Sequence, residues 1–200
     1  MMEAVYPTLA SSLGLFYGSG GGAAPRTGNR HTGLSLCPYN VYPTADGHIA
    51  IITNNETHWR QLAQALNCPQ WLETPGWATV RSRCDDMDAV DAAVAAVTRA
   101  QTKDRLFEVL IRHRVPCAPV RTLQEVVHDP HLHARGALHW VDHPEYGRLV
   151  LPRSALRFPE QEPVPYKPSA ALGADTEQIL ISRLGLSAGE VEALRALHAL

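Results

Sequence analysis

The chain has 200 residues, of which 45% are hydrophobic and 19% charged, and its formal net charge is −2. This length allows one large domain or two small ones around a core of ordinary size. The small net charge argues against a nucleic-acid-binding surface and against a polybasic membrane patch. No signal peptide and no apolar run near the roughly 18 residues typical of a membrane span is present in the sequence.

The four cysteines of the chain are widely separated, and no C-x-x-C pair occurs. This spacing argues against zinc binding and against thioredoxin-like chemistry. A reduced, cytoplasmic protein is therefore predicted.

Residues 2–17 are apolar, with Glu3 as their only charged residue, and they predict a helix. A surface helix of this composition would be poorly solvated, so we expect another part of the protein to bury it. Residues 18–22, GSGGG, predict a flexible linker. No strand precedes this run and no Lys-Ser or Lys-Thr pair follows it, so it is not a phosphate-binding loop.

The central stretch, residues 26–59, predicts a loop, a hairpin and a helix in that order. Residues 27–31 form a polar loop with one glycine, and residues 39–42 and 48–53 read as strands joined by a tight turn. Asn55 can accept a hydrogen bond from a free amide of the helix that follows. The helix has apolar residues spaced for one buried face, namely Trp59, Leu62, Ala63 and Leu66.

Further elements follow along the chain. Residues 71–84 read as irregular, and residues 85–100 predict a helix. Thr102 predicts the cap of another helix, and residues 115–120 predict a short buried strand. The remaining predictions are helices at 123–127, 177–184 and from Ser187 onward, strands at 137–142 and 148–151, and a proline-rich extended strap at 158–168.

Two side-chain patterns invite chemical interpretations that we reject. Cys117 lies in an apolar strand, where burial raises the pKa of a thiol, and no histidine stands beside it in sequence. His128, His131 and His133 suggest a metal site, but Pro130 interrupts the helix that would align the first two. Neither a cysteine nucleophile nor a bound metal is predicted.

Several segments together resemble the class III CoA-transferases, the family of formyl-CoA:oxalate and carnitine CoA-transferases and of the bile-acid-inducible proteins. They are RTGNRH at 26–31, Pro38-Tyr39, YPTADG at 42–47, VPCAPV at 115–120, and the HDP and ARG of 128–136. The resemblance runs from about Met2 to the C-terminus, but it covers only the second half of such a protein. The chain is therefore expected to be a fragment or a truncated gene product.

The resemblance implies an α/β fold in three parts. Residues 1–36 would supply a buried helix and a lid loop of a larger CoA-binding domain. Residues 37–125 would form a small domain with a short antiparallel sheet and helices. Residues 126–200 would form a connector, the strap and C-terminal helices that return to the large domain.

The resemblance also implies transfer of CoA from an acyl-CoA to a carboxylic acid through an aspartyl intermediate. The aspartate nucleophile would belong to the part of the family that this chain does not resemble. No catalytic residue is assigned here, and the chain alone is expected to be inactive. The CoA thioester would be a substrate rather than a permanently bound cofactor, and the full protein would form an interlocked homodimer.

Candidate residues for substrate or CoA binding follow from the same resemblance. The polar loop falls where formyl-CoA transferase carries a glycine-rich lid, although this sequence has one glycine there rather than a run. The turn before the predicted helix supplies two more polar side chains. The candidates are Gly28, Asn29, Arg30, His31, Asn54 and Asn55.

Two alternatives stay open at this point. An α-methylacyl-CoA racemase of the same superfamily would abstract a proton next to the thioester, with Glu56 as its acid/base candidate. The simpler role for Glu56 is an acidic residue that favours the N-terminus of its helix. A non-catalytic binding or interaction module is the third interpretation of the chain.

Overall fold

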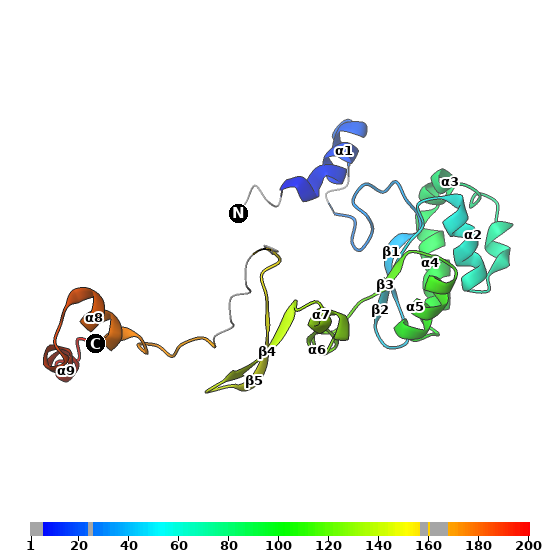
Figure 1. The fold of residues 1–200 in the computed structure, drawn as a ribbon. Helices are drawn as coiled ribbons and strands as arrows, with labels where there is room; N and C mark the ends of the chain where they lie inside the picture. The colour runs from blue at the N-terminus through cyan, green and yellow to red at the C-terminus, as the bar shows by residue number, and fades with distance from the viewer. Residues whose placement is uncertain (1–5, 24–25, 157–159, 161–167) are drawn as a thin grey trace. The chain divides into compact units, whose positions relative to one another are not determined.

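The computed structural model describes residues 6–23, 26–156, 160 and 168–200 (Figure 1). The chain divides into two compact units, Met1–Arg121 and Thr122–Leu200. Each contains helices and short antiparallel strands, so the α/β class expected from the sequence is confirmed. The finer three-part division stays a prediction.

The first unit begins with a short helical segment that carries no charged residue. A 3₁₀ turn, η2 (Tyr6–Leu9), leads into α1 (Ala10–Gly18). Most side chains of this segment are exposed, and Tyr17 retains 76% of its accessible surface. An apolar, exposed helix is consistent with the expectation that another part of the protein covers it, which stays a prediction.

Three strands form one antiparallel sheet in the order β1-β2-β3. β1 (Tyr39–Pro43) and β2 (His48–Ile52) make the expected hairpin, with Tyr39 opposite Ile52. β3 (Cys117–Pro119) joins β2. The prediction of a buried strand here was wrong: in the described part of the chain β3 pairs with β2 alone, and Ala118 is exposed at the sheet edge.

Four α-helices and one 3₁₀ turn accompany this sheet. They are α2 (Glu56–Ala65), η3 (Pro69–Leu72), α3 (Val80–Asp85), α4 (Met87–Thr98) and α5 (Lys103–Arg112). The sequence indicated irregular structure through residue 84, so α3 is a correction. This short helix begins with a capping box, in which the Thr79 and Ser82 side chains each accept from the other's backbone amide.

The core of the first unit lies between the sheet and the helices, which Figure 1 shows gathered beside the strands. The helices turn apolar faces inward, as the spacing of their leucines and valines predicts. Fully enclosed side chains come from both layers: Ile49, Ile51, Leu62, Val90, Val94, Leu106 and Leu110.

Asp46 ties the hairpin turn to the start of α5. Its Oδ1 accepts from the Lys103 amide at 2.8 Å and from the Thr44 hydroxyl at 3.0 Å. The hydrogen bond from the Lys103 amide is the main cause that holds the pKa of Asp46 below its ordinary value. The adjacent Ala45 amide donates to the Gln101 carbonyl at 2.8 Å, so the turn is pinned at two points.

The second unit contains two helical turns, a hairpin and a helix pair. Its elements are α6 (Leu123–Val127), α7 (Pro130–Ala134), β4 (Leu138–His143), β5 (Gly147–Pro152), α8 (Thr176–Leu184) and α9 (Ala188–Ala196). The hairpin and the capping box between Ser187 and Glu190 are confirmed. The expected strap at 158–168 lies almost entirely outside the described residues.

The histidines near α7 pack around Trp140 of β4. The His133 ring stacks on the indole with centroids 5.7 Å apart, and the Arg148 guanidinium lies 4.8 Å from the ring centroid. The His128 and His133 rings also contact the Gln124 and Val127 carbonyls, at 2.9 and 2.8 Å. Among the described residues, no three His, Cys, Asp or Glu side chains gather as a metal site would require, and no helix is long and apolar enough to cross a membrane.

The core position of Leu62 predicts a large stability effect. Leu62 is completely buried, so Leu62→Ala should lower the free energy of unfolding by about 2–5 kcal/mol through lost apolar contact and a residual cavity. Urea unfolding followed by tryptophan fluorescence measures the change. Leu123 is 78% exposed, so Leu123→Ala is the matched control and should change stability by less than about 0.5 kcal/mol.

Candidate functional site

The candidate loop of residues 26–36, called here the Arg30 loop, is anchored by an arginine. Arg30 Nε donates to Asp91 Oδ2 at 2.6 Å, and Nη2 donates to Asp88 Oδ1 at 2.7 Å. Burial lowers the pKa of Arg30, but the hydrogen bonds that it donates to both carboxylates, together with their negative charges, outweigh burial, so the pKa is raised overall. Arg30 therefore uses its guanidinium on the protein's own carboxylates, both from α4.

Asp91 is the buried centre of this anchor. Besides Arg30, it accepts from Asn40 Nδ2 at 2.9 Å and from the Tyr42 hydroxyl, both on β1. Burial and then the charge of Asp91 raise the pKa of Tyr42, so the phenol stays a donor. A single carboxylate thereby joins the loop, the sheet and α4.

The rest of the Arg30 loop is held by short-range contacts. Gly28 has φ = +64°, the left-handed region that glycine occupies without steric cost. The His31 ring stacks on Tyr39 with centroids 4.8 Å apart and planes 7° apart. The Gly33 amide donates to His31 Nδ1 at 3.3 Å, and the Leu34 amide donates to the His31 carbonyl at 3.0 Å.

Asn54 and Asn55 lie together at the start of α2. Asn55 Oδ1 accepts from the His58 amide at 2.8 Å, which confirms the expected helix cap. Asn55 Nδ2 also donates to Asn54 Oδ1 at 2.9 Å. Both side chains are exposed, and their assignment to substrate binding stays a prediction.

Each carboxylate oxygen of Glu56 accepts a hydrogen bond. Oε1 accepts from the Val80 amide and Oε2 accepts from Arg83 Nη2, each at 2.9 Å. Burial raises the pKa of Glu56, but these two hydrogen bonds and the charge of Arg83 outweigh it, so the pKa lies below its ordinary value. A carboxylate held in this way links α2 to α3 and is a weak proton acceptor.

Arg83 is the residue of this region that sequence reasoning missed. Its side chain is completely buried, with Nε donating to the Cys37 carbonyl and Nη1 to the Trp77 carbonyl, each at 2.9 Å. The guanidinium also lies 4.8 Å from the centroid of the Trp59 ring. No local pattern identifies a buried arginine, because its partners come from distant segments.

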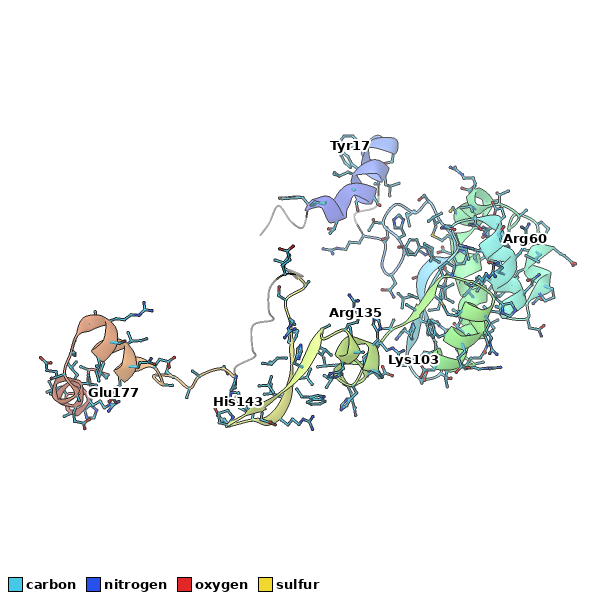
Figure 2. All side chains as sticks on the ribbon, viewed as in Figure 1. Tyr17, Arg60, Lys103, Arg135, His143 and Glu177 are labelled. Atoms are coloured by element: carbon cyan, nitrogen blue, oxygen red, sulfur yellow. The ribbon has the colours of Figure 1, made fainter. Side chains whose placement is uncertain are left out.

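Figure 2 shows the side chains that fill this unit, between the labels of Arg60 on α2 and Lys103 on α5.

The cysteines of the first unit are poor nucleophiles at neutral pH. Burial, followed by the charge of Asp91, raises the pKa of the Cys37 thiol to about 12. Burial alone raises the pKa of the Cys117 thiol to about 11. These pKa values agree with the rejection of Cys117 as a catalytic group.

Comparison with known proteins identifies the family. The model of CoA-transferase family III matches residues 1–176, so the chain belongs to this family, and the resemblance drawn from its motifs is confirmed. The match covers the first unit and the second unit as far as residue 176.

Among the similar proteins, succinyl-CoA–D-citramalate CoA-transferase of Chloroflexus aurantiacus is 31% identical over 172 residues, covering 86% of this chain and 42% of that protein. Formyl-CoA:oxalate CoA-transferase of Bradyrhizobium diazoefficiens is 28% identical over 177 residues, covering 86% and 41%. The chain thus spans about two fifths of the length of these relatives.

A solved structure supports the same fold. The crystal structure of a CAIB/BAIF family protein from Brucella suis matches with a TM-score of 0.72 and 25% identity. The match covers 86% of this chain and 43% of that one.

The ion pair of Glu56 predicts an acid-dependent loss of stability. The folded-state pKa of Glu56 lies below the ordinary value of 4.5, so the unfolded chain takes up the proton first. Its stabilising effect is complete above that ordinary value and is lost as the pH falls through the folded-state pKa. Glu56→Gln should therefore lower stability at neutral pH and flatten the decline in acid. Urea unfolding from about pH 3 to pH 7 measures this, and Glu73→Gln, at an exposed glutamate, should leave the profile unchanged.

The Arg30 anchor predicts the mobility of its loop. Arg30→Gln removes the charged contacts to Asp88 and Asp91, so amide hydrogen exchange in residues 27–36 should rise by about tenfold or more. Arg60→Gln, at an exposed arginine of α2, is the control. Unchanged exchange in the Arg30 variant would show that the local turns alone hold the loop.

Proposed function

We propose that this chain supplies part of a class III CoA-transferase that moves CoA from an acyl-CoA to a carboxylic acid. The match of the family model to residues 1–176 carries this proposal. The names of the relatives, which couple succinyl-CoA with D-citramalate and formyl-CoA with oxalate, support an acyl-CoA and a free acid as the two substrates. CoA enters as a substrate thioester, without a permanently bound cofactor.

The reaction proceeds through an aspartyl intermediate. The carboxylate of the enzyme's aspartate attacks the thioester carbonyl of the acyl-CoA and expels CoA thiolate. This step leaves a mixed anhydride between the aspartate and the acyl group. The thiolate then attacks the aspartyl carbonyl of the anhydride, forms an aspartyl-CoA thioester and releases the first acid. The second acid repeats these two steps in reverse order, so one difficult exchange is divided into easier ones.

The nucleophile belongs to the length of the family that this chain does not match. Three aspartates of the first unit hold parts of the fold together. Asp46 accepts from the Lys103 amide, Asp86 accepts from the Trp77 indole, and Asp91 accepts from Arg30. These contacts support assigning no catalytic aspartate here, and the chain by itself is then inactive.

The Arg30 loop contributes to substrate binding through its backbone amides and through the imidazole ring of His31. Amides on an anchored loop need little reorganisation to stabilise negative charge that develops on a thioester oxygen. Gly28, Asn29 and His31 are the proposed contacts, together with Asn54 and Asn55. Arg30 acts by fixing the loop, because its guanidinium already binds Asp88 and Asp91.

The full protein is an interlocked homodimer in the cytoplasm. The exposed apolar surface of α1 supports this assembly, since Leu13 and Tyr17 retain 50% and 76% of their accessible surface. Exposed apolar side chains of this size favour coverage by another part of the protein or by a second copy.

The racemase and the binding module are the weaker alternatives. The racemase needs Glu56 as a proton acceptor, and the two hydrogen bonds to that carboxylate, with its lowered pKa, argue against the role. Glu56→Gln in the full-length protein separates the two enzymes, because a racemase should lose the chemical step and a transferase should keep it, whereas the loss of stability is expected for both.

A hybrid enzyme tests the proposal. This chain replaces the matching portion of the Chloroflexus aurantiacus relative, which leaves the rest of that protein in place. We expect CoA transfer from succinyl-CoA to D-citramalate at a measurable rate by chromatography of the CoA esters, and no transfer by the chain alone. A hybrid that folds and binds succinyl-CoA without transfer would contradict the proposal, and activity of the chain alone would contradict the placement of the nucleophile.

A further inference from the structure

The first unit contains a hollow between the Arg30 loop and α3. Its volume is about 420 Å³, within the range of roughly 300–1,000 Å³ that is typical of small-molecule sites. The loop and α3 each supply one wall. The lining residues are Leu34, Ser35, Val80, Arg81, Cys84 and Asp85.

Both walls of the hollow are fixed by polar contacts that are buried or partly buried. The loop wall is anchored by the hydrogen bond from Arg30 to Asp91, a residue that is only 8% exposed. The α3 wall is anchored by the fully buried Arg83 and by the Val80 amide, which donates to Glu56 at 2.9 Å. A hollow with fixed walls binds a ligand without first ordering the protein, which favours affinity.

Leu34 adds a local observation that points to function. Its φ is +47°, an uncommon and costly conformation for a residue with a large side chain. The hydrogen bond from the Leu34 amide to the His31 carbonyl, at 3.0 Å, holds this backbone turn. Leu34 lines the hollow, so the strained residue is one that a ligand there would touch.

The lining has an apolar part and a charged part. Leu34, Val80 and Cys84 supply hydrocarbon and sulfur surface, whereas Arg81 and Asp85 supply opposite charges. Arg81 Nε lies 3.4 Å from Asp85 Oδ1, and the two side chains are 88% and 65% exposed. Exposed pairs of this kind are weak. A ligand carboxylate can therefore take the place of Asp85 beside the guanidinium, whose planar fork suits that group.

We propose that this hollow binds a small monocarboxylic acid with a short apolar body. The carboxylate pairs with Arg81, and the apolar body packs on Leu34, Val80 and Cys84. The inference concerns binding by the chain itself and does not depend on CoA transfer, so it stands or falls separately from the proposed function.

Nuclear magnetic resonance of the full chain tests the proposal with hexanoate as the probe. We expect saturable changes in the amide shifts of Leu34, Ser35, Val80 and Cys84, and binding of hexan-1-ol about threefold weaker, since the alcohol lacks the charge that the exposed Arg81 recognises. Changes that do not saturate, that lie elsewhere on the chain, or that hexan-1-ol matches at the same concentrations would overturn the proposal.

Three variants separate the two parts of the site. Arg81→Gln should weaken hexanoate binding by about threefold and leave hexan-1-ol binding unchanged. Asp85→Asn should strengthen hexanoate binding, because it removes the competing carboxylate. Cys84→Phe should abolish binding of both probes by filling the hollow.

Arg105→Gln is the matched control, because Arg105 also pairs weakly on a helix, with Glu108 at 3.9 Å, and lies outside the lining. The amide spectrum of each variant verifies its fold in the same experiment. Equal affinities of Arg81→Gln and Arg105→Gln for hexanoate would exclude Arg81 as the carboxylate partner.

Discussion

The buried guanidinium of Arg83 is the interaction on which the first unit depends. A cation removed from water is strongly unfavourable unless its donors are paired, and here three acceptors and the face of Trp59 surround it. The acceptors belong to the segment before β1, to the turn before α3 and to the first residue of α2. One side chain thus sets the positions of elements that are far apart in sequence, including the wall of the hollow.

A second guanidinium, that of Arg30, performs the corresponding task for the loop. The loop has little apolar surface of its own, so its position comes from the carboxylates of Asp88 and Asp91 and from the stacking of His31 on Tyr39. The glycine-rich lid that formyl-CoA transferase carries at this position suggests a segment that is free to close. In this chain the loop is held against β1 and α4, so the binding role that we propose for it is that of a fixed surface.

Local patterns predicted much of the fold. The β1–β2 and β4–β5 hairpins, the Asn55 cap and the capping box at Ser187 depend on side chains a few residues apart, which sequence spacing displays directly. The family was likewise visible in short ordered motifs. The two errors have different causes. The short helix α3 is a single capped segment without an apolar period, and the exposure of Ala118 depends on which strands lie beside β3.

The sequence by itself determined most of the elements, the family and the candidate segments, because these follow from neighbouring residues and from motif order. Only the tertiary structure decided what the candidate side chains do. Arg30 meets Asp91 across 61 positions, and Glu56 meets Arg83 across 27. Charged groups such as these look alike in sequence whether they face a ligand or each other. Their role is decided by which opposite charge the packed core brings within hydrogen-bond distance, and no local pattern records that.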